Sequence, residues 1–584
     1  MRNMRIAAAC STILAGCAQI PSKTTEAGPE ASAPAATQAR EQPRPEPPAR
    51  VEPLPNQDLT AQILYQLLLA EIAGQRGDLA LSAAAYLDLA KKTRDPRIAR
   101  RATEVAHYGR QNDAAIDAAI VWLDIDPESP QARQMLVSLL AQSGRYAEMQ
   151  PQLAKMLAEN PNDVGASIQR IGRLLARNPD RRAVLGVVDT FTQPYLGVPE
   201  ARILRAQTAH SAGEQERALR EIDAALDLQP DSEQAILIKA QMLQQDAPAK
   251  ALETLRVFLQ RHPNARDVRL QYARALVGEK RYEEARAEFQ RLLADFPDNN
   301  DVLFAVGALS FQLNDYPAAE KSFRKLIDNE YPDTGAIRLY LGQISENQKR
   351  LDDALGWYGS VPAGEQYIAA QIRMAQVLAQ QGKLDEARRH LQQASTASNR
   401  ERVQLTLAEA QLLRDNGRTQ EAFDVLDRSL AAQPNQPDLL YEAGLLAERL
   451  GRTDVSESYL RKLIQIKPDH AHAYNALGYS LADRNERLDE AQSLIGKALQ
   501  LSPDDPFIMD SMGWVLFRKG DFKGALDYLT RAYALRPDPE IAAHLGEVLW
   551  AMGRKDEAAK TWKDAAKANP GNEVLSGAIK RFLQ

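Results

Sequence analysis

The chain has 584 residues, which is more than one hydrophobic core organises, so it must divide into domains or repeat. Hydrophobic residues make up 44% of the chain and charged residues 26%, a composition that argues against a disordered protein. The formal net charge is −6 without any block of lysine or arginine, which argues against a nucleic-acid partner. Aromatic residues are only 6%, and the abundance of Ala, Leu, Gln and Arg favours helices over strands.

The first 17 residues have the pattern of a bacterial secretion signal. Arg2 and Arg5 give a positive start, and a short apolar segment follows over residues 6–15. Residues 14–17 read Leu-Ala-Gly-Cys, which resembles the bacterial lipobox. The resemblance implies that residues 1–16 are a lipoprotein signal peptide and that Cys17 carries a lipid such as palmitate. The alternative is a short secretory signal in which the cysteine occurs by chance.

Cysteine usage agrees with lipidation. Cys10 lies in the segment that would be removed, so a lipidated Cys17 leaves no thiol for a disulfide, a metal site or a nucleophile. Several acyl chains on one residue anchor stably, because each buried CH₂ contributes about 0.8 kcal/mol. In the bacterial sorting pattern an Asp after the cysteine favours the inner membrane. Ala18 at this position implies the outer membrane, with the protein facing the periplasm.

Residues 17–56 are predicted to be the lipidated cysteine and a disordered tether rich in Pro and Ala. Residues 43–48 read Pro-Arg-Pro-Glu-Pro-Pro, a composition that cannot form a packed core. At about 3.1 Å per residue in a polyproline-like chain, a tether of this length reaches on the order of 100 Å. We therefore expect the folded body to stand away from the membrane.

From about residue 57, prolines punctuate helical segments at intervals of 33 to 35 residues. The clearest run is Pro434, Pro468, Pro503, Pro537 and Pro570. A proline at such a place stops one helix and suits the start of the next. A short two-helix repeat cannot bury its apolar face alone, so the sequence predicts stacked helical hairpins with a continuous core.

Small residues occupy two further fixed positions in the period, 24 and 12 residues before the proline. Gly546 and Ala558 precede Pro570 at these distances, and Gly513 and Ala525 hold the same places one repeat earlier. Two antiparallel helices cross closely only where neither presents a bulky side chain. These positions therefore predict the crossing point of each hairpin.

The recurring Gly, Ala and Pro positions resemble those of the tetratricopeptide-repeat (TPR) family. The resemblance implies an all-α superhelical solenoid of about fifteen hairpins over residues 57–570, with a protein-binding groove lined mostly by first helices. A capping helix is expected in residues 571–584. Asn178-Pro179 interrupts the pattern, so an irregular unit is expected near residues 164–198. A Sel1-like or HEAT array is the structural alternative, although such arrays have longer periods.

No catalytic motif is present, so we expect a binding protein and not an enzyme. A Gly-rich phosphate loop, a serine nucleophile elbow, CxxC and HExxH are all absent from the sequence. His470 and His472 come nearest to a metal-ligand pair, but residues two apart on a helix point to different sides. We predict no cofactor and no metal.

Partner-binding residues are expected on first helices near the C-terminus, at positions outside the hairpin core. They are Asn475, Tyr479, Asp483, Asp510, Trp514, Arg518 and Glu547. Trp514 follows the packing position Gly513, where a large aromatic side chain would suit a binding anchor. The alternative is that Trp514 packs between neighbouring repeats. Asn475 is expected either to hydrogen-bond a bound backbone or to be a solvated amide.

The helix that begins near Leu59 is a second candidate surface. Leu59, Ile63 and Leu67, with Leu64, Leu68 and Ile72, give more apolar surface than one helix stripe needs. Terminal repeats normally turn a polar face outward. The surplus therefore predicts a docking surface beside the tether, unless the helix only packs on residues 79–89.

Two phrases resemble one subgroup of large proteobacterial TPR lipoproteins. Residues 473–479 read AYNALGY and residues 510–514 read DSMGW. The subgroup is similar to the lipoprotein binding partner of a periplasmic carboxyl-terminal processing protease, which binds that protease and gathers its substrates. The resemblance implies a non-catalytic outer-membrane adaptor for the protease and its cell-wall hydrolase substrates.

Two other roles stay open on the sequence alone. One is an assembly lipoprotein for an envelope machine such as a type IV pilus, either pilotin-like or an outer-membrane biogenesis factor. The other is a scaffold for exopolysaccharide export. The length of the chain favours an adaptor, because an adaptor must hold two partners or wrap around one.

Overall fold

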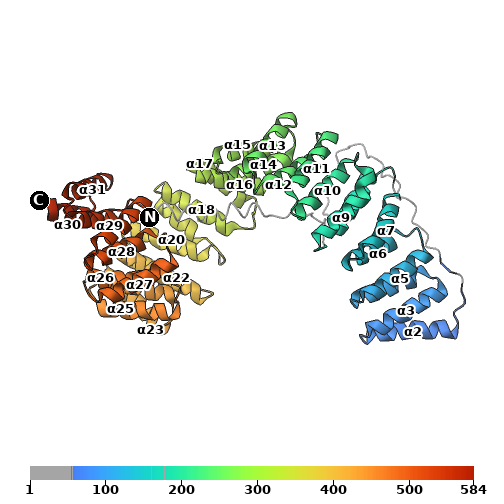
Figure 1. Cartoon of the computed structure of the whole chain (residues 1–584), viewed down its shortest axis with the longest axis horizontal. Helices are drawn as coiled ribbons and strands as arrows, with labels where there is room; N and C mark the ends of the chain where they lie inside the picture. Colours follow the sequence, from blue (N-terminus) through green and yellow to red (C-terminus); the bar gives the residue numbers. More distant parts are fainter. Residues whose placement is uncertain (1–53, 56, 159–160, 177, 584) are drawn as a thin grey trace. The chain divides into compact units, whose positions relative to one another are not determined.

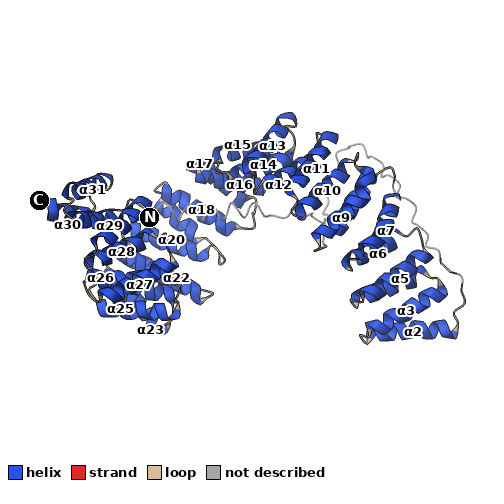
Figure 2. Cartoon of the chain, in the orientation of Figure 1, coloured by secondary structure: helices blue, strands red, loops and turns tan. Residues whose placement is uncertain are grey.

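The fold is known from a computed structural model that describes residues 54–55, 57–158, 161–176 and 178–583. Within these residues there are 31 α-helices, one short 3₁₀ helix and no strand (Figure 2). The all-α solenoid expected from the repeat is therefore confirmed. The expected signal peptide, Cys17 and nearly all of the expected tether lie outside the described residues. The chain forms two compact units, Met1–Asp315 and Tyr316–Gln584.

The first unit consists of helical hairpins that follow one another in chain order (Figure 1). The two helices of a hairpin pack on each other, and the main contacts of a hairpin are with the hairpins next to it. The helices are α2 (Ala61–Gln75), α3 (Leu79–Thr93), α4 (Pro96–Tyr108), α5 (Asn112–Ile125), α6 (Pro130–Gln142), α7 (Tyr146–Ala158), α8 (Val164–Leu175), α9 (Arg181–Thr192), η1 (Gln193–Tyr195), α10 (Pro199–Ser211), α11 (Gln215–Leu228), α12 (Glu233–Leu243), α13 (Pro248–Arg261), α14 (Arg266–Gly278), α15 (Tyr282–Asp295) and α16 (Asn300–Gln312).

The second unit continues the same construction and closes with one additional helix. Its helices are α17 (Tyr316–Asp328), α18 (Thr334–Asn347), α19 (Leu351–Gly359), α20 (Tyr367–Gln380), α21 (Leu384–Gln393), α22 (Asn399–Asp415), α23 (Thr419–Ala432), α24 (Pro437–Arg449), α25 (Thr453–Ile466), α26 (Ala471–Asp483), α27 (Leu488–Leu501), α28 (Pro506–Arg518), α29 (Phe522–Leu535), α30 (Pro539–Ala551), α31 (Lys555–Ala568) and α32 (Glu573–Leu583). Helix α32 packs on both helices of the last hairpin.

The small residues of the repeat mark the closest approach of the two helices in a hairpin. A Cβ atom on Gly546 would lie 2.1 Å from Nε1 of Trp562, and one on Gly342 would lie 2.3 Å from Cε1 of Tyr358. Ala558, the small residue of the second helix, is completely buried. Large side chains such as Trp562 therefore fill the core because their partners across the hairpin have no side chain of their own.

The segment that breaks the sequence pattern also breaks the regular hairpin geometry. Helix α9 runs directly into the 3₁₀ turn η1. Asn178, in the turn between α8 and α9, donates from Nδ2 to the carbonyl oxygen of Ala141 at 2.7 Å. The interruption at Asn178-Pro179 thus ties this turn to the end of α6 in the preceding hairpin.

Candidate functional site

The first helices α26, α28 and α30 contact one another in sequence within the second unit. They bring together most of the residues expected to bind partners near the C-terminus. Tyr479 comes from α26, Asp510, Trp514 and Arg518 come from α28, and Glu547 comes from α30. We call this set, together with His544 of α30, the C-terminal cluster.

An ion pair between neighbouring hairpins lies at the centre of the C-terminal cluster. Nδ1 of His544 is 3.0 Å from both carboxylate oxygens of Asp510, and the two side chains are only 13% and 9% exposed. Burial by itself would lower the pKa of His544. The charge and hydrogen bond of Asp510, together with the charges of Glu547 and Glu540, outweigh that effect and raise the pKa above its ordinary value.

Aromatic rings enclose this ion pair. The ring of Trp514 stacks on that of His544 with a centroid distance of 4.2 Å. The Tyr479 ring is tilted relative to the His544 ring, and their centroids are 6.1 Å apart. Burial raises the pKa of Tyr479, so its hydroxyl stays protonated. Burial likewise raises the pKa of Glu547, against the opposing charges of His544, Arg581 and Arg518. The cluster is therefore a largely buried polar centre shared by three consecutive repeats.

Trp514 is only 6% exposed, so its ring packs between neighbouring repeats, as the alternative interpretation expects. Its Nε1 has no hydrogen-bond partner, and neither has Nε of Arg518. The Arg518 guanidinium lies 5.7 Å from the Trp514 ring centroid and donates to the carbonyl oxygen of Asp483 at 3.0 Å. Asn475 also has an unpartnered oxygen, Oδ1. A partner role for these residues stays a prediction.

His544 is the central residue that the sequence analysis missed. It stands 34 residues after Asp510, which is one repeat length, so the two residues occupy nearly equivalent places on consecutive first helices. Aligning the repeats and searching for opposite charges at equivalent places would have found the pair. Glu448 of α24 was missed as well; it accepts from the hydroxyl of Ser480 at 2.6 Å.

Helix α2 exposes most, but not all, of the apolar residues that the sequence suggests for a docking surface. Leu59, just before the helix, is 69% exposed, but Ile63 is half-buried and Leu67 packs onto the core. The apolar face that stays exposed consists of Leu59, Leu64, Tyr65, Leu68 and Ile72, each at least 42% exposed. We call these five residues the α2 face.

The two histidines examined as possible ligands make separate contacts. Nδ1 of His470 accepts from the backbone N–H of Ala473 at 3.1 Å and caps α26, while Nε2 of His472 lies 3.9 Å from Asp505. No group of three or more His, Cys, Asp or Glu residues suited to a metal occurs among the described residues. The described helices also include none that is long and apolar enough to span a membrane.

Comparison with known proteins places the repeat in a family. Two family profiles described as tetratricopeptide repeat match the chain, one over residues 242–308 and the other over 307–367, 372–437, 441–506 and 511–573. The chain is 33% identical over 491 residues to the TPR repeat-containing protein PA4667 of Pseudomonas aeruginosa, an alignment covering 83% of this chain and 82% of that protein. It is 28% identical over 175 residues to cellulose synthase operon protein C of Pseudomonas fluorescens, covering 29% of this chain and 14% of that protein.

Solved structures with similarity to the chain include a bacterial TPR protein and the yeast protein Tom70. A thermophilic TPR protein of Thermus thermophilus is 26% identical with a TM-score of 0.29, covering 31% of this chain and 98% of that chain. Yeast Tom70 is 16% identical with a TM-score of 0.34, covering 72% of this chain and 95% of that chain. The family profiles together match more than half of the residues, and the Pseudomonas aeruginosa relative aligns over most of both chains. The chain therefore belongs to the tetratricopeptide-repeat family of protein-binding scaffolds.

Proposed function

We propose that the chain is a non-catalytic adaptor, anchored by lipid in the outer membrane, that binds a carboxyl-terminal processing protease in the periplasm and gathers its cell-wall hydrolase substrates. The observation that carries the proposal is the α2 face. Tyr65 in this face is 66% exposed and Leu68 is 50% exposed. An apolar face of several neighbouring residues favours a protein-binding surface over an ordinary solvated helix.

Helix α2 is firmly attached to the unit on its other side. Ala70 and Ala73 are buried, and Ser82 of α3 donates to the carbonyl oxygen of Ala70 at 2.7 Å. The hydroxyl of Tyr86 in α3 also donates to Glu71. The α2 face is therefore held rigidly, directly after the segment that we expect to tether the protein. A protease bound there would be concentrated near the membrane and near substrates held elsewhere on the chain.

Changing Leu64 and Leu68 together to serine should greatly reduce recovery of the protease. The measurement is a pull-down with residues 57–584 from a crosslinked periplasmic extract, followed by mass spectrometry. The wild type should recover a carboxyl-terminal processing protease and wall hydrolases. A matched control changes Leu228 and Leu535, which are 46% and 60% exposed, to serine, and should recover as much protease as the wild type. Recovery of secretin or pilus components without protease or hydrolase would refute the adaptor role in favour of envelope assembly.

Changing Cys17 to serine should move the protein from the membrane fraction to the soluble periplasmic fraction. The acyl chains contribute about 0.8 kcal/mol per buried CH₂, and no described helix offers a second anchor. Cell fractionation with density-gradient separation of the two membranes measures the effect. The matched change, Cys10→Ser, should leave the protein in the outer membrane. Retention of the Cys17→Ser protein in the membrane would contradict lipid anchoring at this residue.

A further inference from the structure

Two cavities lie side by side on the first helices of the first unit, at the irregular hairpin of α8 and α9. One cavity of about 460 Å³ is lined mainly by α8, α10 and α12, and the other, of about 470 Å³, by α6, α8 and the turn after α8. Arg173 of α8 lines both. Each volume lies in the range of ligand-binding pockets. The two cavities adjoin at Arg173 and are lined by residues of the four first helices α6, α8, α10 and α12, and we call them together the groove.

Two small residues, Gly172 of α8 and Ala176 directly after it, line the first cavity. Gly172 has no side chain, and a Cβ there would lie 2.7 Å from Cδ1 of Leu204 on α10, so the two helices approach closely. Ala176 lines the same cavity and leaves its space empty. Asn178 and Pro179, in the turn that interrupts the repeat, form a wall of the second cavity. The break in the repeat pattern is therefore also what shapes the groove.

The groove contains two arginines without partners. Arg170 and Arg173 are exposed on α8, and neither side chain makes a hydrogen bond or an ion pair with any residue that the structure describes. Arg181 lines the first cavity and donates to the carbonyl oxygen of Ala176 at 2.7 Å. Glu200 is the acidic residue that lines these cavities, so the cations outnumber the carboxylates there by three to one.

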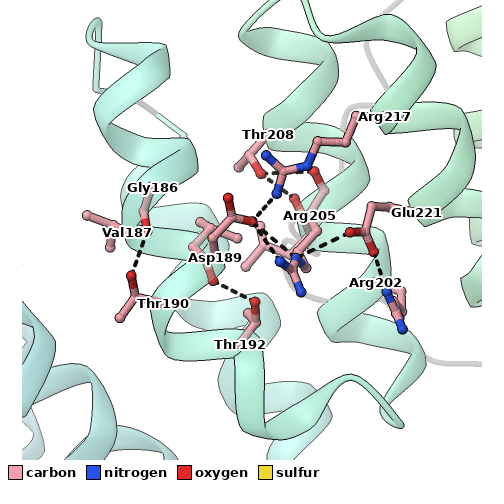
Figure 3. Close-up of polar contacts among 12 residues, drawn as sticks. Gly186, Val187, Asp189, Thr190, Thr192, Arg202, Arg205, Thr208, Arg217 and Glu221 are labelled. Carbon is pink, nitrogen blue, oxygen red and sulfur yellow. Dashed lines mark hydrogen bonds and ion pairs between the residues drawn. The ribbon is translucent and has the colours of Figure 1, made fainter.

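On the adjoining side of α10, by contrast, every arginine is paired (Figure 3). Arg205 bonds Asp189 of α9 at 3.1 Å, and Arg217 of α11 bonds the same carboxylate. Arg202 pairs with Glu221 of α11 at 2.7 Å. This network fixes α10 against α9 and α11, whereas Arg170 and Arg173 remain available.

Amide side chains complete the lining of the groove. Gln134, Gln169, Gln207, Gln234 and Gln241 line the two cavities. A glutamine amide both donates and accepts hydrogen bonds, which matches the alternating N–H and C=O groups of an extended polypeptide. Apolar side chains lie between the amides, among them Leu174, Ile203 and Ile238, and would receive apolar side chains of a ligand.

We propose that this groove binds an extended acidic peptide segment of a partner protein, with Arg170 and Arg173 pairing with its Asp or Glu side chains. Arginine and carboxylate form paired, charge-assisted hydrogen bonds, and both guanidiniums are free to make them. A uniformly charged polyanion fits less well, because its charged groups would lie against the glutamine amides and apolar side chains of the groove. The site is separate from the α2 face, and the proposal goes beyond the role of protease adaptor.

Fluorescence anisotropy with two labelled 12-residue peptides tests the proposal on the full chain in mild detergent. One peptide alternates Glu or Asp with Leu or Val, and the other carries Gln or Asn in place of each acid. The acidic peptide should bind at least ten-fold more tightly than the amide peptide, and more weakly as salt rises. The double variant Arg170→Gln/Arg173→Gln should lose at least ten-fold in affinity. Ala176→Leu, which fills the first cavity without changing charge, should also weaken binding.

A control removes the same charge elsewhere in the first unit. Arg182→Gln/Arg220→Gln changes two exposed arginines that do not line the cavities and should bind the acidic peptide as the wild type does. Equal binding of both peptides, or full affinity in the Arg170/Arg173 variant, would overturn the proposal. So would tighter binding of heparin with the same dependence on these arginines. The assay contains no protease, and Leu64→Ser/Leu68→Ser should leave it unchanged, so its result is independent of the adaptor role.

Discussion

Replacing His544 by alanine is expected to lower the free energy of unfolding of the C-terminal repeats by about 3–5 kcal/mol. The change leaves the carboxylate of Asp510 buried without its charged partner and removes the ring that stacks on Trp514. Because repeats unfold in local groups, hydrogen–deuterium exchange of α28 and α30 is the appropriate measurement. His472→Ala removes a histidine that is 54% exposed and should change the same exchange rates little. Equal effects of the two variants would show that the buried pair contributes no special stability.

The same pair should make the stability of these repeats depend on pH. The folded protein holds the His544 proton more tightly than the unfolded chain does, since Asp510, Glu547 and Glu540 together more than offset the effect of burial on its pKa. Its contribution is therefore complete below the unfolded-state pKa of about 6.5 and is lost as the pH rises through the higher folded-state pKa. The wild type should lose stability over that window, and His544→Ala should lack this loss.

Replacing Trp562 by alanine is expected to cost about 3–5 kcal/mol and to release the C-terminal helix α32. Trp562 is completely buried, its Nε1 donates to the carbonyl oxygen of Ala543 at 3.1 Å, and its ring stacks on Phe582 of α32. Without it the last hairpin would expose core, and a solenoid depends on its terminal cap for solubility. Thermal unfolding together with limited proteolysis after α31 measures the loss. Trp357→Ala, at a half-buried position, should have a clearly smaller effect.

The partner residue Gly546 provides a check on the mechanism. Gly546→Ala should cost about 1–3 kcal/mol in the wild type, because the new Cβ meets the Trp562 ring. In the Trp562→Ala background that ring is gone, so the same change should cost much less. If the free-energy losses of Gly546→Ala and Trp562→Ala are additive in the double variant, Gly546 is not needed for the close approach to Trp562.

Much of the fold could be predicted because steric demands repeat. Small residues such as Gly546 and Ala558 recur at fixed positions in the repeat, because each hairpin needs a small residue on each helix where the two helices cross. In the structure Gly546 and Ala558 lie at such a crossing. The irregular hairpin was predictable from Asn178-Pro179 for the opposite reason, since a residue before proline is pushed out of helical conformation. Its consequence, a groove with unpaired arginines, was not predictable. Whether a guanidinium meets a carboxylate depends on the register of neighbouring hairpins.

The candidate sites show where periodicity stops being informative. On α2 the apolar residues run almost all the way round the helix, so the sequence pattern alone does not separate inward-facing from outward-facing positions. Contact with α3 decides between them, turning Leu67 inward and leaving Leu64 and Leu68 outside. Trp514 was ambiguous for a similar reason, because a first-helix position beside the crossing point can face either the groove or the next repeat. The stacked ring of His544 decides for the next repeat.

The restriction of each hairpin's main contacts to its neighbours also bears on how the chain acquires its structure. A protein whose contacts are local can fold in the order in which it is delivered, without waiting for its distant end. As the chain emerges, each new hairpin would find its partner surface already formed by the hairpin before it. The growing end would present an uncovered apolar edge at each step, and α32 would cover that edge on the hairpin of α30 and α31.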